Sequence, residues 1–134
     1  MILWYDDVRP PIHIDAVFWA RTNKTAQWFV EHNDRNISHA FLDHDMGMHT
    51  VHPEEAEAFT HLVRGPWHNG LHLVEWLIRH GYLRKSVITI HSWNPDGAKR
   101  MKQALIAANY ENVYYAPFNE EWYGKDFLLP QLRA

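Results

Sequence analysis

The chain of 134 residues contains no cysteine. That absence excludes a disulfide scaffold and any metal site built on thiolates. Long hydrophobic runs are missing as well, since no stretch approaches the ~18 apolar residues of a membrane-spanning helix. Only a few apolar residues precede Asp6 at the N-terminus, which is not the pattern of a signal peptide. We therefore expect a cytoplasmic protein without a membrane partner.

Neither positive nor negative charge is in large excess, because the formal net charge is −3 at pH 7. Such a charge gives no long-range attraction to nucleic acid, so duplex DNA is not an expected partner. Hydrophobic residues make up 46% of the chain and aromatic residues 14%, which is typical of a packed globule. Without repeats or linkers, residues 1–134 are expected to form one domain. An oligomer is compatible with this composition.

Short apolar runs predict strands at residues 2–5, 16–19, 37–42, 87–90 and 113–116. Apolar residues spaced by three and four predict helices at residues 22–33, 68–80 and 95–108. Thr22 and Asn94 are expected N-caps, and Gly81 is an expected C-terminal stop. Pro53 is expected in a first helical turn, and residues 119–134 as a helix or arm. Strands that alternate with helices predict a doubly wound parallel α/β sheet.

Polar residues follow three of the expected strands, and these residues are Asp6 and Asp7, then Asp43, His44 and Asp45, then His91 and Ser92. In an open α/β sheet, ligands bind where the parallel strands end and the loops begin. These strand ends are therefore expected to form the floor of one site.

The strand ends resemble those of a response-regulator receiver domain. Such a domain has an acidic pair after its first strand, an aspartate after its third and a serine or threonine after its fourth; the corresponding residues here are Asp6, Asp7, Asp43 and Ser92. The resemblance implies a receiver-like (flavodoxin-like) three-layer sandwich around a five-stranded parallel sheet. Receivers carry Lys-Pro after the last strand, where this chain has Ala116-Pro117. Because alanine cannot pair with a phosphoaspartate, we do not expect phosphoacceptor signalling.

The chain is more similar to a divergent branch of receivers, the cyclic-phosphate processing receiver domains. Its four blocks are matched in order by Trp4, Asp6, Asp7, Arg9 and Pro10, by Arg21 and Thr22, by Leu42 to Asp45 with Gly47, and by His91 to Met101. The resemblance implies hydrolysis or binding of cyclic phosphates, such as cyclic nucleotides or cyclic-phosphate RNA ends. It also implies a role in conflicts between phages and bacteria.

The three aspartates Asp6, Asp7 and Asp43 are expected to hold a metal ion. Carboxylates that lie close together repel one another unless a cation neutralises them. Oxygen ligands suit Mg²⁺ or Mn²⁺, which would polarise a phosphoryl oxygen and supply hydroxide. Alternatively Asp43 attacks the phosphorus directly. The structural alternative is that these aspartates only begin loops and cap helices.

Candidate proton carriers are His44 and His91, because histidine titrates near neutral pH and can protonate a leaving oxygen. Each could instead be a hydrogen-bonded structural histidine. Ser92 and the free N–H groups of the helix that begins at Pro95 are expected to hold the phosphate.

Four further residues are expected at the ligand. Asn94 could touch it or only cap its helix, whereas Arg9 and Arg21 could clamp a phosphate with two hydrogen bonds each. Asp45 completes the polar strand end and is expected to contact the ligand.

Histidine and tryptophan are abundant, with eleven and seven residues. A zinc site is an alternative for some histidines, since His68 and His72 are four residues apart; the other members are His49, His52 and His61. Trp67 and Trp93 are the tryptophans expected to stack on a base.

Metal-dependent hydrolysis of a cyclic phosphodiester is the leading hypothesis. Two alternatives remain open. One is a binding module that sequesters a nucleotide messenger without cleaving it. The other is a degenerate receiver that acts through protein–protein contacts.

Overall fold

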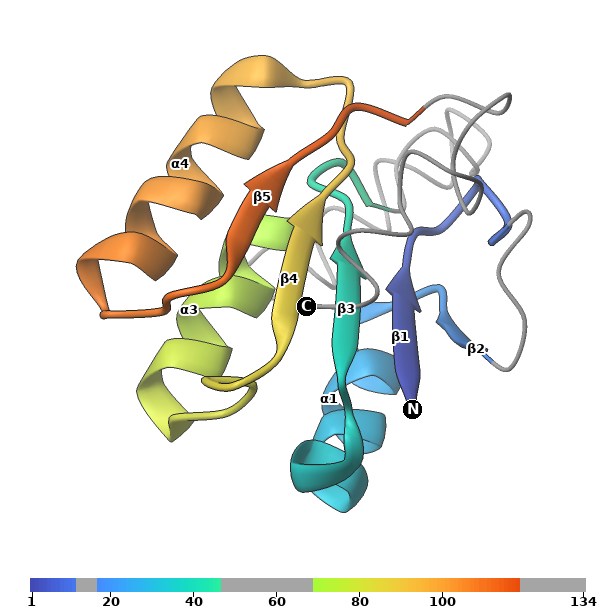
Figure 1. Cartoon of the computed structure of the whole chain (residues 1–134). Helices are drawn as coiled ribbons and strands as arrows, with labels where there is room; N and C mark the ends of the chain where they lie inside the picture. The colour runs from blue at the N-terminus through green and yellow to red at the C-terminus, as the bar shows by residue number, and fades with distance from the viewer. Residues whose placement is uncertain (12–16, 47–68, 119–134) are drawn as a thin grey trace, which may run out of the picture.

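The computed structural model describes residues 1–11, 17–46 and 69–118. Within these ranges the chain forms a five-stranded, all-parallel sheet (Figure 1). Its strands are β1 (Ile2–Tyr5), β2 (Val17–Ala20), β3 (His39–Leu42), β4 (Val87–Ile90) and β5 (Val113–Tyr115). The spatial order is β2-β1-β3-β4-β5. The order of the strands reverses between β1 and β3, and open α/β sheets bind ligands at such a reversal.

In the described ranges, three α-helices connect the strands: α1 (Asn23–Asn33), α3 (Gly70–His80) and α4 (Pro95–Ala107). Each begins at a side chain that accepts a hydrogen bond from the first turn, namely Thr22, Asn69 and Asn94. These caps satisfy main-chain donors that have no partner inside a helix. The short 3-10 helix η1 (Asp34–Asn36) follows α1.

The helices in the described ranges pack on one face of the sheet (Figure 1). Their buried residues recur at intervals of three and four, as in Ala26, Phe29 and Val30 of α1. From the sheet, Leu3 and Leu42 enter the same core and are fully buried. Burial of one such side chain contributes about 1.5–3 kcal/mol to folding.

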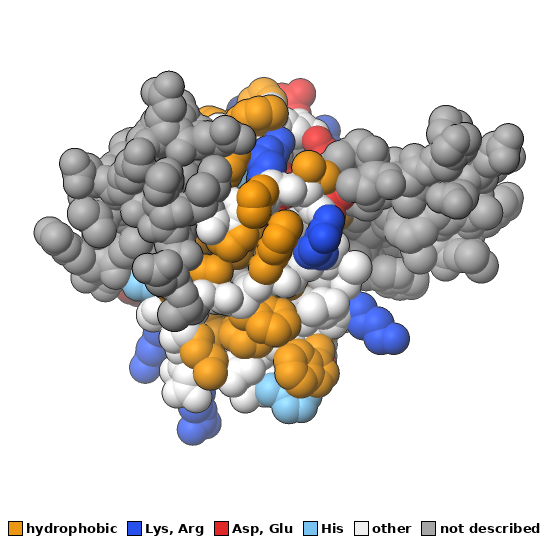
Figure 2. Space-filling view, turned by 90° about the vertical axis from the view of Figure 1, so that its right-hand side faces the viewer, with side chains coloured by type: hydrophobic (Ala, Val, Ile, Leu, Met, Phe, Trp, Pro, Cys, Tyr) orange, Lys and Arg blue, Asp and Glu red, His pale blue; other side chains and the backbone are white. Residues whose placement is uncertain are grey.

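The opposite face of the sheet carries a smaller apolar cluster. Its buried members are Trp4, Phe41, Ala116 and Phe118. Successive side chains of a strand point to opposite faces, which is why Trp4 lies here while its neighbour Leu3 lies in the helix-covered core. Seen from the side of β2, apolar side chains gather across the middle of the surface (Figure 2).

The predicted parallel sheet and its five strands are confirmed, with boundaries that move by one or two residues. The third strand begins at His39 rather than at residue 37, because the Ile37 amide closes η1 by donating to Asp34 at 3.3 Å. The structure describes helices on one face only. The expected turn at Pro53 and the expected helix or arm at 119–134 lie outside the described residues. No helix in the described ranges is long and apolar enough to cross a membrane.

We expect Gly70→Ala to destabilise the fold, because Gly70 fits α3 against the loop after β3. Its amide donates to the His44 carbonyl at 2.8 Å, and a Cβ at this position would lie 2.0 Å from the Asp43 carbonyl oxygen. The obstructing atom belongs to the backbone, so the cost should reach or exceed the ~1–3 kcal/mol of an overpacked core. Urea unfolding measures the change in the free energy of unfolding.

Gly81→Ala is the matched control. Gly81 has a φ of 71° and open space for a Cβ, with the nearest atom at 3.9 Å. It should therefore lose only the ~1–2 kcal/mol that a left-handed residue costs. Equal losses for the two variants would show that close packing at Gly70 is unimportant.

Candidate functional site

Three polar residues extend the central strands in register and form one row. β1, β3 and β4 pair up to their last residues, and Asp6, Asp43 and His91 come next. The main-chain ladder continues through them, because the Asp43 amide donates to β1 and the His91 amide donates to β3, both at 3.0 Å. One potential metal-binding atom of each side chain, a carboxylate oxygen or an imidazole nitrogen, lies within 4.8 Å of the other two. The register therefore brings two carboxylates and an imidazole together.

Asp6 is fully buried, and each of its carboxylate oxygens accepts hydrogen bonds. Oδ1 accepts from the amides of Val8 and Arg9 at 2.9 and 2.8 Å, and Oδ2 accepts from His91 Nε2 at 2.8 Å. Burial by itself would raise the pKa of Asp6, but the hydrogen bond and charge of His91, together with the two amides, lower it. Asp6 is therefore held as a carboxylate.

Asp43 is buried beside Asp6 and has the opposite electrostatic balance. Burial raises the pKa of Asp43, and the neighbouring charge of Asp6 raises it further. The charges of His91 and Arg9 and a hydrogen bond from the His44 amide oppose this shift without cancelling it. Ionisation of Asp43 is therefore less favourable than in water, and additional positive charge would offset this cost.

Arg9 provides the cationic side chain in contact with both carboxylates. Its Nη1 lies 3.4 Å from Asp6 Oδ2 and 3.5 Å from Asp43 Oδ1. The guanidinium also lies over the Trp93 ring, with Cζ 4.3 Å from the ring centroid. At the position of the receiver lysine, Ala116 is buried. In this chain, positive charge reaches Asp43 from the loop after β1 instead.

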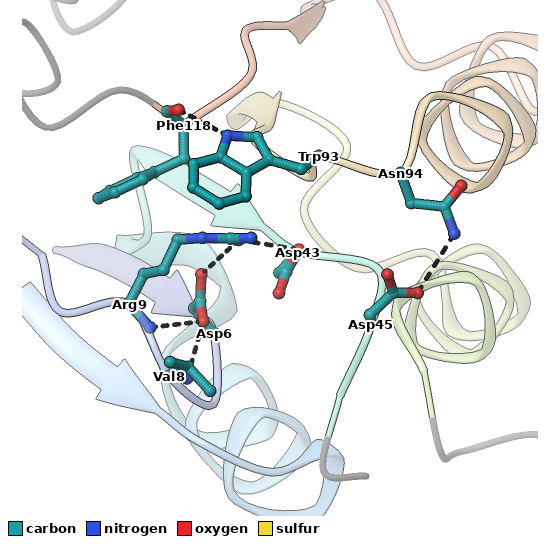
Figure 3. A pocket seen from close by; sticks show the side chains of 8 residues that line it. All are labelled: Asp6, Val8, Arg9, Asp43, Asp45, Trp93, Asn94 and Phe118. Carbon is teal, nitrogen blue, oxygen red and sulfur yellow. Dashed lines mark hydrogen bonds and ion pairs between the residues drawn. The ribbon is translucent and has the colours of Figure 1, made fainter. Parts of the chain in front are cut away.

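A cavity of about 580 Å³ opens over the carboxylates. Its lining residues are Asp6, Val8, Arg9, Asp43, Asp45, Trp93, Asn94 and Phe118. In Figure 3 the Arg9 side chain lies between Trp93 and the Asp6 carboxylate, with Asp45 and Asn94 on the far side of Asp43. The cavity thus joins a charged floor to an aromatic wall.

His44 borders this site through Asp45. His44 Nδ1 lies 2.6 Å from Asp45 Oδ1, and Asn94 Nδ2 donates to the same oxygen at 3.3 Å. Asn94 also caps α4 by accepting from the Gly97 amide at 2.9 Å, which is one of the two roles considered for it, and it lines the cavity. A Cβ at Gly97 would lie 2.5 Å from the His44 ring, which shows how closely this imidazole packs on α4.

Three predicted site residues lie elsewhere. Asp7 is buried but is not part of the group formed by the row residues. Arg21 donates to the Asp7 main-chain carbonyl through Nε and Nη2, at 3.1 and 2.9 Å. The hydroxyl of Ser92 accepts from the Asn94 amide at 3.0 Å. The register places His91, rather than Ser92, beside Asp43.

His91 is not among the residues that line the cavity, and its Nε2 is hydrogen-bonded to Asp6 Oδ2. It stacks on Trp4 with ring centroids 4.5 Å apart. Since an Asp6 carboxylate can only accept, Nε2 carries the proton of their hydrogen bond. His91 therefore orients Asp6 and is a positioning residue.

The sequence analysis did not predict that Val8 and Phe118 line the cavity. It also did not predict the hydrogen-bonded pair of Tyr5 and Asn23 near the aspartates. The Tyr5 hydroxyl donates to Asn23 Oδ1. Burial, followed by the charges of Asp43, Asp7 and Asp6, raises the pKa of Tyr5 well above its usual value. A polar tip on the otherwise apolar first strand was the available signal for Tyr5. Val8 and Phe118 gave none, because isolated apolar residues occur on most surfaces.

The Asp6 and Asp43 carboxylates can hold a divalent cation, with His91 behind Asp6. Hydrogen bonds to metal-binding carboxylates are common and fix the orientation of the ligand. Oxygen donors fit Mg²⁺ or Mn²⁺. The raised pKa of Asp43 is compatible with this fit, because a bound cation would offset the cost of a buried carboxylate charge. The histidine positions 49, 52, 61 and 68 lie outside the described residues.

We expect Asp43→Asn and Asp6→Asn to change stability in opposite directions in the presence of a chelator at pH 7. The folded pKa of Asp43 is raised, so its carboxylate costs stability as the pH rises from its unfolded pKa, about 3.9, through the folded value. Asp43→Asn removes that cost. The folded pKa of Asp6 is lowered, so its contribution is present above about pH 3.9 and is lost as the pH falls through the folded value. Asp6→Asn should lose ~1–3 kcal/mol.

Urea unfolding at several pH values measures both effects. A loss of stability in Asp43→Asn at pH 7 would contradict this electrostatic description.

Comparison with known proteins agrees with this geometry. The family model for the cyclic-phosphate processing receiver domain matches residues 1–107, which include all three residues of the row. No curated protein matches the chain. Because the match spans well over half of the sequence, the chain belongs to the cyclic-phosphate processing receiver domain family.

Proposed function

We propose that the protein hydrolyses a cyclic phosphodiester with the help of Mg²⁺ or Mn²⁺ held by Asp6 and Asp43. The substrate would be a cyclic nucleotide or an RNA end that carries a cyclic phosphate. The observation that carries the proposal is the buried row of Asp6, Asp43 and His91, whose two carboxylates line a cavity. Membership of a family described as processing cyclic phosphates supports this substrate class.

In the proposed reaction, a water oxygen forms a bond to phosphorus and one ring P–O bond breaks. The freed oxygen receives a proton, so the product is a phosphomonoester. A bound divalent cation would polarise the phosphoryl oxygen and lower the pKa of water. Arg9 would contact the phosphoryl group, because its guanidinium lines the cavity beside the two carboxylates. His91 keeps Asp6 ionised and oriented.

Proton delivery is assigned to His44 and Asp45 rather than to His91. Asp45 lines the cavity and its side chain is 60% exposed, so it can meet a ligand. The imidazole of His44 lies behind it at 2.6 Å and can exchange a proton with it. His91 does not line the cavity, and its Nε2 is hydrogen-bonded to Asp6.

We expect Asp43→Asn to abolish turnover. The assay would incubate the protein with cyclic mono-, di- and oligonucleotides and with RNA ending in a 2′,3′-cyclic phosphate, each with Mg²⁺, Mn²⁺ or a chelator. Chromatography would separate the products. Glu111→Gln is the control, because Glu111 is exposed at the end of the sheet opposite the cavity and should keep full activity.

Metal-dependent product that disappears in Asp43→Asn would support the hydrolase. Binding of one probe without product would favour the sequestering module. Full activity in Asp43→Asn would contradict the proposed metal site. The role in conflict between phages and bacteria stays a prediction.

His44→Asn should lower kcat by about a hundredfold, the lower end of the range for general acid–base catalysis. Its effect on Mn²⁺ affinity should be small, because His44 does not belong to the group of possible ligands among the described residues. His32→Asn, an exposed histidine on α1, is the matched control. An unchanged kcat and pH profile in His44→Asn would remove His44 from the mechanism.

A further inference from the structure

Trp93 is the most exposed large hydrophobic side chain in the described part of the chain, at 63%. Its orientation is nevertheless fixed. The indole Nε1 donates to the Phe118 carbonyl at 2.7 Å, and the Arg9 guanidinium covers one face of the ring at 4.3 Å. The exposed area therefore belongs to the other face and the edges. A flat, rigid aromatic surface left open to water is suited to stacking.

The surroundings of Trp93 show what kind of ligand would use this surface. Val8 and Phe118 also line the cavity, and Val8 is 43% exposed. A cation and a phosphate alone would need no apolar wall. The cavity volume of about 580 Å³ falls within the range of sites that bind whole small molecules, roughly 300–1,000 Å³. The ligand should thus have an uncharged, flat part next to its phosphate.

Arg9 links the charged and aromatic parts of the cavity. One side of its guanidinium faces Asp6 and Asp43, and the other contacts Trp93 (Figure 3). A ligand whose phosphoryl group meets Arg9 therefore has its remaining atoms close to the indole. In a nucleoside cyclic phosphate, the part next to the phosphate is a ribose that carries an aromatic base.

We infer that Trp93 binds the base of the substrate by stacking, so that the protein selects cyclic phosphates of nucleosides over cyclic phosphates without a base. This inference rests on the proposed function and assigns the residue that recognises the base of its substrate. Stacking tolerates every base, because each base has a π-face. The selectivity should therefore be for the presence of a base rather than for its identity.

The test compares three probes by calorimetric titration and by turnover in Mn²⁺. The probes are 2′,3′-cyclic AMP, the base-free 1,2-cyclic phosphate of glycerol, and a short RNA with a 2′,3′-cyclic phosphate end. We expect Trp93→Ala to weaken binding of the two base-bearing probes by about ten- to a hundredfold. Its affinity for the glycerol compound should not change. Tighter binding of 2′,3′-cyclic AMP would indicate a free nucleotide as the substrate, and tighter binding of the RNA would indicate an RNA end.

Two variants control for loss of structure. Trp93→Phe keeps an aromatic face but loses the hydrogen bond to Phe118, so it should retain most of the affinity for base-bearing probes. Trp28→Ala removes a tryptophan that is 53% exposed on α1 and does not line the cavity, and it should bind all probes normally. Urea unfolding of each variant shows whether it is folded.

Different results would overturn base stacking by Trp93 and the proposed cyclic-phosphate function. If the wild-type protein binds or cleaves the glycerol compound as well as the nucleotides, and Trp93→Ala affects all probes alike, base stacking is overturned while the cyclic-phosphate function stands. If the wild-type protein neither binds nor cleaves any probe, the proposed function is overturned and the stacking inference with it.

Discussion

Two carboxylates that share a buried position at the edge of the sheet are the constraint on which the site depends. Asp6 and Asp43 are adjacent because β1 and β3 pair in register up to their last residues. Side chains at equivalent positions of paired strands must lie side by side, so the fold itself creates the repulsion. The positive charges of Arg9 and His91 offset part of it, and Asp43 still has a raised pKa. A site with this remaining imbalance is suited to bind a cation, at some expense of stability.

The same constraint explains the arrangement of the neighbouring residues. Asp6 turns the chain by accepting from the amides of Val8 and Arg9, and this turn directs the Arg9 guanidinium back over the carboxylates. Trp93 then packs on the guanidinium, and Phe118 accepts the indole N–H. Arg9 thus joins the charged floor of the cavity to its aromatic wall.

Much of this could be predicted from the sequence, because short apolar runs that end in polar residues locate both the strands and their functional edge. The parallel sheet and the resemblance to cyclic-phosphate processing receiver domains are confirmed. The pattern could not show which of two consecutive polar residues joins the row. That choice depends on strand register, which placed His91 rather than Ser92 beside Asp43. Nor could it show that Arg21 would be engaged by a main-chain carbonyl, since this contact depends on the path of the loop after β1.

We propose that Asp6 and Asp43 form a divalent-cation site. Electron paramagnetic resonance tests it directly, because the six-line signal of free Mn²⁺ decreases when the ion binds to protein. Titration of the wild-type protein should show one bound Mn²⁺ per chain, and Asp43→Asn should leave the ion free while remaining folded. Equal binding by Asp43→Asn, or no binding by the wild-type protein, would contradict a cation site at Asp6 and Asp43.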